Sequence, residues 1–409
     1  MNKTDTIYKD SPLGKIPNDW EVKHLEDIAD IDTNSLSNST LGDYKFKYIS
    51  LSDVESGGSI FETTDQVFKT APSRARRIVQ KGNVLMATVR PNLQGFSIIK
   101  DDVENLIAST GFAVISVKKC NNEFLFHSLF GSAISKQFYQ LIVGSNYPAI
   151  NSSDVRRLKL SIPPFPEQTA ISACLSTLDK AITYTTALIA QKELQKKWLM
   201  QQLLTGKRRL PGFDKEKWKL KLLEDVLIPV SRPVDKPSSS FLALGIRSHG
   251  KGTFLKHDFD PAKIDMETLF SVKENDLIVN ITFAWEGAIA IVKKEDDGAL
   301  VSHRFPTFIF NPKSGVIDFF RHLILQPKFK YLLDLISPGG AGRNRVLSKK
   351  DFLKLEVKLP PMEEQTAIAQ VLQAADKEIS LLKAKLEKLK EQKKGLMQVL
   401  LTGKMRLEF

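Results

Sequence analysis

The chain carries one stretch of sequence twice. The first copy is Pro163-Pro164-Phe165-Pro166-Glu167-Gln168-Thr169-Ala170-Ile171, and the second, 197 residues later, is Pro360-Pro361-Met362-Glu363-Glu364-Gln365-Thr366-Ala367-Ile368. The same offset holds without a gap to Asp179-Lys180 and Asp376-Lys377, and it still holds where Leu203–Lys207 matches Leu400–Lys404. Self-similarity at a fixed period indicates a repeated structural unit, so the sequence predicts two copies of one unit.

A weaker similarity lies upstream of each copy. Trp20, followed by Leu25-Glu26-Asp27, returns as Trp218, followed by Leu223-Glu224-Asp225. Each half is therefore a variable region of about 145 residues and a repeated segment of about 45 residues. A length of 409 residues also exceeds what one ordinary hydrophobic core holds, which favours two domains.

The repeated segment is predicted to be helical. The Pro-Pro pair excludes helix before it, Glu167 and Glu364 lie in or near the first turn, where a carboxylate favours the positive helix end, and Gly206 and Gly403 are C-terminal stops. A helix of about 38 residues is on the order of 57 Å long, too long to lie across one small core. Apolar residues recur at two heptad positions, which predicts two long antiparallel helices that form a coiled coil; the alternative is that each helix lies alone on its own domain. The polar exceptions, which would set the register at a cost in stability, are Thr185, Lys192, Lys196 and Lys393.

The variable regions combine strand-like and helix-like stretches, so the predicted fold class is α+β. Aromatic-rich stretches at 123–143 and 317–336 are predicted to be helices. The strand-like stretches are 46–51, 83–89 and 112–117 in the first half and 276–283, 288–292 and 306–310 in the second.

The composition points to a polyanionic partner. Lys and Arg number 59 against 47 Asp and Glu, which gives a formal net charge of +12, and nucleic acid is the first candidate partner of so basic a chain. Part of that excess lies on Lys383, Lys385, Lys388 and Lys390, which could equally be a solvated helix face. The two cysteines exclude a disulfide scaffold and fit a reducing compartment. With no long apolar run and a polar N-terminal stretch, the sequence predicts a cytoplasmic protein.

The chain lacks the motifs of the nucleic-acid enzymes that a basic two-domain protein suggests. Gly206-Lys207 and Gly403-Lys404 are not followed by Ser or Thr, so neither forms a phosphate-binding loop. Ile162 precedes Pro163-Pro164-Phe165 where an adenine methyltransferase needs a polar residue, and Glu21-Val22-Lys23 lacks the distant carboxylate of a nuclease site. The six histidines show no metal-ligand spacing. We therefore expect a binding protein with no catalytic residue and no metal site.

The order of these motifs resembles that of the specificity subunit of type I restriction–modification enzymes. The resemblance covers essentially the whole chain. It is carried by Pro-Pro-x-x-Glu-Gln-x-x-Ile at residues 163–171 and 360–368, by Ile16-Pro17-x-x-Trp20, and by Leu-Leu-Thr-Gly-Lys at the end of each copy. Each motif alone is moderately specific, whereas all of them duplicated in this order are highly specific.

The resemblance implies a division of labour. Such a subunit binds double-stranded DNA at a bipartite target and joins two modification subunits, which carry the adenine N6-methyltransferase, and in restriction two motor–nuclease subunits. It has no cofactor of its own; S-adenosylmethionine, ATP and magnesium are expected in the partner subunits. The implied domains are recognition domain 1 at 1–162, a central conserved helix at 163–206, a linker at 207–216, recognition domain 2 at 217–359, and a distal conserved helix and tail at 360–409.

Candidate DNA contacts lie in basic, polar or glycine-rich loops of both variable regions. Arg makes two hydrogen bonds to guanine, and Asn or Gln two to adenine, while glycines let the backbone approach a phosphate. The alternatives are a solvated basic edge that touches phosphates only and a turn without a ligand. The candidates are Ser73, Arg74, Arg76, Arg77, Arg90, Asn92, Gln94, Asn146 and Tyr147 in the first half, and Arg247, Ser248, His249, Lys251, Arg304, Arg343, Asn344 and Arg345 in the second.

Two further functions are compatible with the same sequence. A stand-alone DNA-binding regulator with a coiled-coil core would bind its operator without methylation subunits. A catalytic restriction enzyme would methylate DNA without a partner, which the missing motifs argue against.

Overall fold

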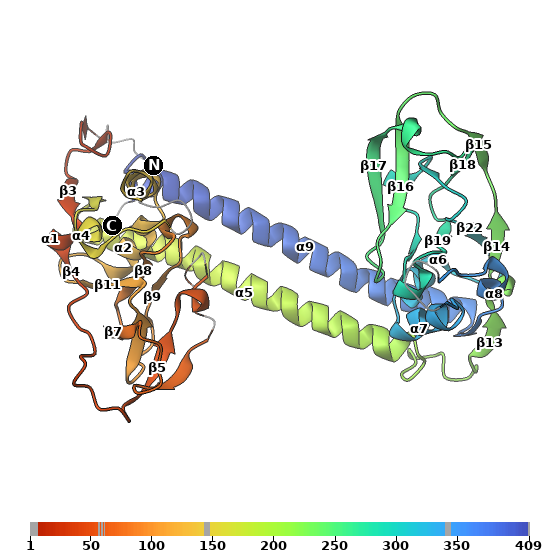
Figure 1. Cartoon of the computed structure of the whole chain (residues 1–409), viewed down its shortest axis with the longest axis horizontal. Coiled ribbons are helices and arrows are strands. Elements are labelled where there is room, and N and C mark those ends of the chain that lie inside the picture. Colours follow the sequence, from red (N-terminus) through yellow and green to blue (C-terminus); the bar gives the residue numbers. More distant parts are fainter. Residues whose placement is uncertain are drawn as a thin grey trace. The chain divides into compact units, whose positions relative to one another are not determined.

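A computed structural model of the chain describes residues 7–55, 58, 60, 62–142, 148–339 and 345–407. It divides into two compact units, one made of residues up to 186 together with residues from 385 onward, and the other of residues 187–384. Each unit combines small sheets with helices, which confirms the α+β class (Figure 1). Among the described residues, no helix is long and apolar enough to cross a membrane.

The first unit contains two four-stranded sheets and two pairs of strands. One sheet has the order β6-β5-β10-β7 and the other β4-β11-β8-β9. The predicted strands at 46–51, 83–89 and 112–117 are confirmed as β5, β8 and β11 with slightly different ends. The bounds are β1 Tyr8–Lys9, β2 Ile16–Pro17, β3 Glu21–His24, β4 Ala29–Ile31, β5 Lys45–Ile49, β6 Thr64–Val67, β7 Ala75–Val79, β8 Val84–Ala87, β9 Phe96–Ile98, β10 Leu106–Ser109, β11 Phe112–Val117 and β12 Lys159–Ile162, with helices α1 Leu25–Ile28 and α4 Ser152–Arg156.

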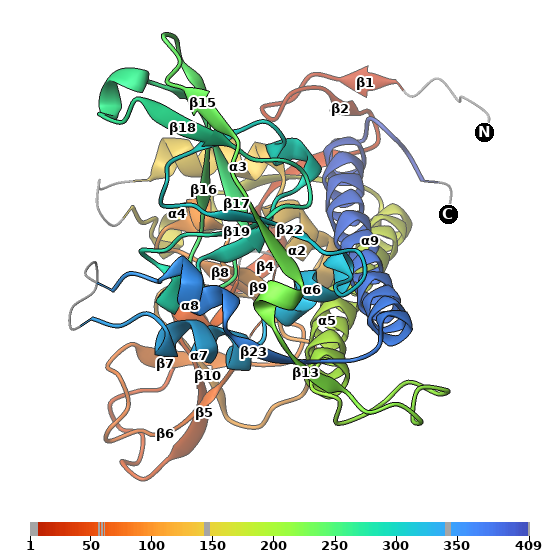
Figure 2. The ribbon, with the colours of Figure 1, turned by 90° about the vertical axis from the view of Figure 1, so that its right-hand side faces the viewer.

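The second unit contains a five-stranded sheet of order β15-β18-β21-β16-β17 and a four-stranded sheet of order β14-β22-β19-β20. Its neighbouring strands β16 and β17 are antiparallel and lie side by side in the foreground of Figure 2. The predicted strands at 276–283, 288–292 and 306–310 are confirmed as β19, β20 and β22. The bounds are β13 Lys219–Leu222, β14 Leu227–Val230, β15 Pro233–Asp235, β16 Phe241–Ile246, β17 Thr253–Phe259, β18 Thr268–Ser271, β19 Leu277–Val279, β20 Ile289–Ile291, β21 Leu300–Val301, β22 Thr307–Phe310 and β23 Glu356–Leu359, with helix α8 Lys349–Leu353.

Two helices stand where the sequence predicts one in each half. The stretch 123–143 forms α2 (Asn122–Leu129) and α3 (Ser132–Leu141), and 317–336 forms α6 (Ile317–Leu323) and α7 (Pro327–Leu335). Gly131 is the N-cap of α3 and has an extended backbone, while Pro327 begins α7. Glycine weakens a helix interior and proline cannot donate the backbone hydrogen bond there, so each stretch breaks at these residues.

The repeated segments form the two longest helices, α5 (Phe165–Leu203) and α9 (Met362–Leu400), of 39 residues each. The two helices contact each other within each unit: Lys393 of α9 pairs with Asp179 of α5 in the first, and Lys192 of α5 pairs with Glu378 of α9 in the second. The residues at the predicted heptad positions are buried or half-buried, while most residues between them are exposed. This pattern is that of a helix with one covered stripe.

The duplicated glutamates hold three segments together in each unit. Glu167, whose side chain has no exposed surface, accepts hydrogen bonds from Trp20 Nε1 at 3.0 Å and from Arg406 Nε at 2.6 Å. Glu364 likewise accepts from Trp218 Nε1 at 3.0 Å and from Arg209 Nε at 2.6 Å. The expectation that these carboxylates serve the helix end therefore misses their main contacts.

The glutamines of the same motif bind the chain just before α2 and α6. Gln168 Oε1 accepts from the backbone N–H of Asn121, the N-cap of α2, at 2.8 Å, and its amide donates to Pro163 O. Gln365 Oε1 accepts from Val316, the N-cap of α6, at 2.9 Å. Both glutamines are buried, so the Glu-Gln pair fixes the start of each long helix to its unit's core.

Candidate nucleic-acid interface

Arg76 and Arg77 lie inside strand β7 rather than in a loop. Successive side chains of a strand point to opposite faces, so the two guanidinium groups are separated. Arg76 stacks over the ring of Phe68 at 4.6 Å, half-buried. Arg77 points instead to Asp32, with a nitrogen–oxygen distance of 3.0 Å.

The Asp32–Arg77 ion pair connects separate segments within the first unit. Asp32 is nearly buried, with a side chain 4% exposed, and it also accepts hydrogen bonds from the backbone N–H of Val114 at 2.9 Å and from Ser152 Oγ at 2.6 Å. The charge of Arg77 therefore has a partner already. Ser73 and Arg74, just before β7, have exposed side chains.

Arg90, Asn92 and Gln94 lie around a 3-10 helix, Pro91–Leu93, that follows β8. Arg90 and Gln94 both have left-handed backbones, with φ of 51° and 56°, and the Arg90 N–H donates to Pro148 O at 2.7 Å. Side chains rarely adopt this conformation unless their surroundings impose it. The turn therefore presents Arg90 and Asn92 as exposed side chains on a fixed backbone.

Arg247, Ser248, His249 and Lys251 form the turn of the hairpin between β16 and β17. The Arg247 guanidinium lies 5.0 Å from the centroid of the Phe254 ring and donates to Thr253 O at 3.3 Å. Ser248 donates to Glu286, and Lys251 is exposed. The structure thus brings these four candidates together.

Lys256 was missed by the sequence reasoning. Its ammonium lies 5.8 Å from the Phe254 ring centroid and 5.6 Å from that of Phe259, on the same hairpin as Arg247. The available signal was that Lys256 and His257 lie between the aromatic residues Phe254 and Phe259. Stacked on aromatic rings, both cations lose less freedom on binding a phosphate than free side chains would.

Arg345 is engaged within its own unit. Its guanidinium donates to Ser337 O at 3.0 Å and to Asp334, and it stacks over Trp285 at 5.0 Å. Arg304 is exposed, and its backbone N–H donates to Ser302 Oγ. The candidates Asn146, Tyr147, Arg343 and Asn344 lie outside the described residues.

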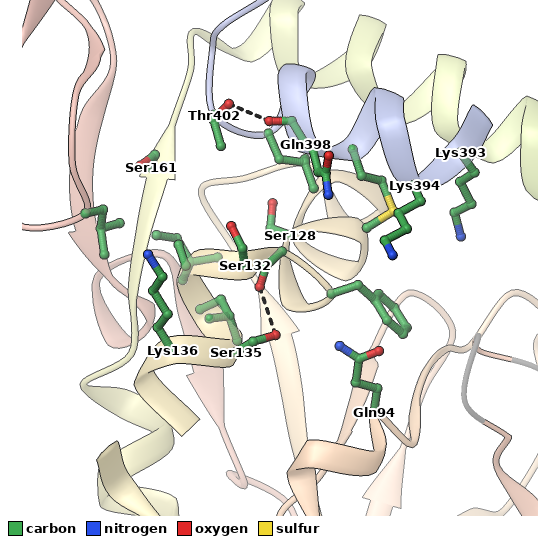
Figure 3. Close-up of a pocket in the computed structure, with 18 of the residues that line it drawn as sticks. Gln94, Ser128, Ser132, Ser135, Lys136, Ser161, Lys393, Lys394, Gln398 and Thr402 are labelled. Atoms are coloured by element: carbon green, nitrogen blue, oxygen red, sulfur yellow. Dashed lines mark hydrogen bonds between the residues drawn. The ribbon is translucent and has the colours of Figure 1, made fainter. Parts of the chain in front are cut away.

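A cavity of about 740 Å³ lies in the first unit, between α3, β12 and the parts of α5 and α9 in that unit (Figure 3). Gln94 lines it, together with Lys136 and the α9 side chains of Lys393, Lys394 and Gln398. Half-buried Gln94 therefore borders a cavity whose other wall carries basic side chains of α9.

The buried side chains of His127 and Cys120 have strongly shifted pKa values. Burial lowers the pKa of His127 to about 3 and raises the pKa of Cys120 to about 12, so both groups are neutral at physiological pH. Within the described part of the chain, no three His, Cys, Asp or Glu side chains are grouped so that they could hold a metal ion. Basic and polar side chains on fixed turns suit binding of a polyanion instead.

A protein-family model and a related protein both indicate a type I restriction specificity subunit. The family model described as "Type I restriction modification DNA specificity domain" matches residues 17–194 and 261–391. A protein from Methanocaldococcus jannaschii, provisionally named type I restriction enzyme MjaX specificity subunit, is 26% identical over 98% of this chain and 97% of its own length.

Two solved structures share the fold. The HsdS subunit from Thermoanaerobacter tengcongensis is 22% identical, with a TM-score of 0.53 and coverage of 95% of this chain and 98% of that chain. A chain from a study of complex assembly and conformational transition of the type I R-M system is 20% identical, with a TM-score of 0.60 and coverage of 95% and 99%.

Proposed function

Because the chain belongs to the type I restriction–modification DNA specificity family, we propose that its two units each read one part of a bipartite DNA target. The observation that carries the proposal is the match of one family model to both halves, each built around the same tryptophan–glutamate–arginine contact. Two similar modules on one chain suit a target with two specified parts.

The chain is a specificity subunit and not itself an enzyme, since specificity subunits of this family are non-catalytic. We propose that it joins two modification subunits, which hold S-adenosylmethionine and methylate adenine N6 after extracting the base from the duplex. In restriction, two motor–nuclease subunits with ATP and magnesium would complete the assembly. The two unpaired cysteines suit work in the cytoplasm.

We also propose how the chain is divided. Residues 1–162 and 217–359 are the two recognition domains, and residues 163–206 and 360–409 hold the conserved helices, joined through a linker at 207–216. The helices form an antiparallel coiled coil related by the internal repeat, and their length sets the spacer. The ion pairs between α5 and α9 within each unit and the covered heptad positions of both helices support this arrangement.

The side chains proposed to contact DNA are basic and polar groups, most of them exposed in turns. In the first unit these are the exposed Arg74 and Arg90 and the half-buried Arg76 of β7, with Ser73, Asn92 and Gln94 beside them. In the second they are the hairpin residues Arg247, Ser248, His249 and Lys251, to which we add Lys256, and Arg304. Arg77 and Arg345 are proposed to support the backbone, because Asp32 and Asp334 hold their charges.

The test is reconstitution of the chain with the modification subunits that accompany it, followed by methylation of unmodified genomic DNA and mapping of N6-methyladenine. We expect one motif with two short specified parts separated by an unspecified spacer. The chain without partners should methylate nothing. An undivided motif would contradict the proposal, and methylation by the chain alone would revive a catalytic enzyme.

The stand-alone regulator is disfavoured by the family assignment. It still makes a distinct prediction, because it would bind its operator without modification subunits. Electrophoretic mobility shifts with and without those subunits separate the two functions: specific binding at nanomolar concentrations by the isolated chain, unchanged by the partners, would favour the regulator.

A further inference from the structure

The two units contain the same three-part side-chain cluster. In the first, Lys393 Nζ of α9 lies 2.5 Å from Asp179 Oδ1 of α5, and His127 Nδ1 of α2 lies 3.8 Å from the other oxygen of Asp179. In the second, Lys196 of α5 pairs with Asp376 of α9, and His322 Nε2 of α6 lies 3.9 Å from Asp376. Each cluster therefore joins both long helices to an interior helix of its unit.

The first cluster is more enclosed than an ordinary surface ion pair, and the second is enclosed on its lysine and histidine sides. The Lys393 and Asp179 side chains are 15% and 24% exposed, whereas Lys196 is 21% and Asp376 45% exposed. His127 and His322 are buried, and burial lowers the pKa of both rings, so each aspartate faces a neutral imidazole and one lysine. In the first cluster, removing one partner costs more than removing one partner of an exposed pair, because the remaining charge stays largely enclosed.

Both clusters specify the same alignment of the helices. In an antiparallel pair, the numbers of facing residues have a constant sum, and 179 with 393 gives 572, as does 196 with 376. The apolar heptads do not specify it, because a slip of seven residues again brings apolar positions together.

A slip of one heptad removes every cluster contact. In one direction it would place Lys196 opposite Lys383 and Lys393 opposite Thr186. In the other it would place Lys196 opposite Ala369 and Lys393 opposite Ser172. Neither alternative register places an acid directly opposite either lysine.

We propose that the Asp179–Lys393–His127 and Asp376–Lys196–His322 clusters are positioning sites that hold α5 and α9 in one register, seat each unit on the helices, and thereby determine the spacer length. The claim that the clusters fix the register of α5 and α9 rests on the contacts described above alone. The claim that they thereby determine the spacer length rests on the proposed function.

The test compares Lys196→Met/Lys393→Met with a control, Lys385→Met/Lys390→Met. Both double variants remove two positive charges, but Lys385 is exposed and Lys390 pairs with Glu387 of its own helix. Carbodiimide coupling, which joins an ammonium to a touching carboxylate as an amide with loss of water, reports the register through Lys383–Glu193 and Lys192–Glu378, at 2.6 and 2.7 Å. Mapping of N6-methyladenine with the modification subunits reports the spacer.

We expect the cluster variant to lose roughly tenfold in both coupling products and to methylate sites with additional spacer lengths, with unchanged half-site sequences. The control should behave as the unmodified chain. Unchanged coupling in the cluster variant would overturn the register assignment, and changed coupling with an unchanged spacer would overturn the role in spacing. Failure of the unmodified complex to methylate any bipartite site would instead count against the proposed function, because the coupling arm needs no DNA.

If the Lys196→Met/Lys393→Met variant does not fold, a variant with exchanged charges tests the same proposal. Asp179→Lys/Lys393→Asp combined with Asp376→Lys/Lys196→Asp keeps both pairs but reverses them. Recovery of the Lys383–Glu193 product and of the single spacer supports the inference. A folded exchange variant without either recovery contradicts it.

Discussion

At the scale of single residues, His127 is a buried base whose protonation opposes folding. Its pKa is lowered to about 3 from an ordinary value of 6.5, chiefly because burial disfavours the charged ring. Between these values the unfolded state binds the proton and the folded state does not, so the stability contribution is complete above pH 6.5 and is lost as the pH falls.

Acidification from pH 7 to pH 5 should therefore lower the free energy of unfolding through His127 by on the order of 2 kcal/mol. His127→Gln should remove that part of the pH dependence, whereas the exposed His303→Gln should not. Urea unfolding at several pH values measures it. The same pH dependence in all three proteins would contradict a lowered pKa of His127 in the folded state.

Two arginines that the sequence treats alike are predicted to behave differently. Arg247 is exposed and stacked on Phe254, whereas Arg345 is bound by Asp334 and Ser337. Arg247→Ala should weaken DNA binding and lower the slope of log affinity against log salt concentration by about 1. Arg345→Ala should leave that slope unchanged while lowering thermal stability. Fluorescence anisotropy of the complex with DNA across a salt series measures the slopes, and equal slopes for both variants would contradict the distinction.

At the scale of elements, Glu364 connects the start of α9 to Trp218, just before β13, and to Arg209, just after α5. Glu364→Gln keeps the size of the side chain but removes its charge, and we expect a loss of about 3 kcal/mol in the stability of the second unit. Glu363→Gln, one residue earlier and exposed, is the matched control and should be near neutral. Hydrogen exchange of β13 and α9 measures local opening; equal protection in both variants would show that the contact contributes little.

The long helices and most of the strands could be predicted from sequence because their signals are local. Proline pairs, heptads and runs such as residues 112–117 need no knowledge of distant contacts. The break between α2 and α3 was missed because aromatic residues continue on both sides of Gly131, which masks the local signal of that glycine; Phe124 and Phe138 lie in the same core. The roles of Arg77 and Glu167 could not be predicted either, since their partners Asp32 and Arg406 are far away in sequence.

At the scale of the whole molecule, the proposed ruler predicts a graded change. Inserting one heptad into both long helices, after Thr186 in α5 and after Ala384 in α9, adds roughly 10 Å to each while leaving both charge clusters intact. We expect the methylated motif to keep its two parts and to lengthen its spacer by about three base pairs. Insertion into one helix alone is the control and should abolish methylation, because the helices then differ in length. An unchanged spacer after the double insertion would contradict the ruler.

The buried indoles of Trp20 and Trp218 should make the unfolding of each unit visible in tryptophan fluorescence. Trp20 and Trp218 lie beside a carboxylate and a guanidinium, at 0% and 9% exposure, whereas Trp198 is 46% exposed. Of the four tryptophans, one buried fluorophore therefore belongs to the glutamate contact of each unit. Trp20→Phe and Trp218→Phe would each leave one such emitter, so that the melting of the two halves could be followed separately by the red shift of its emission.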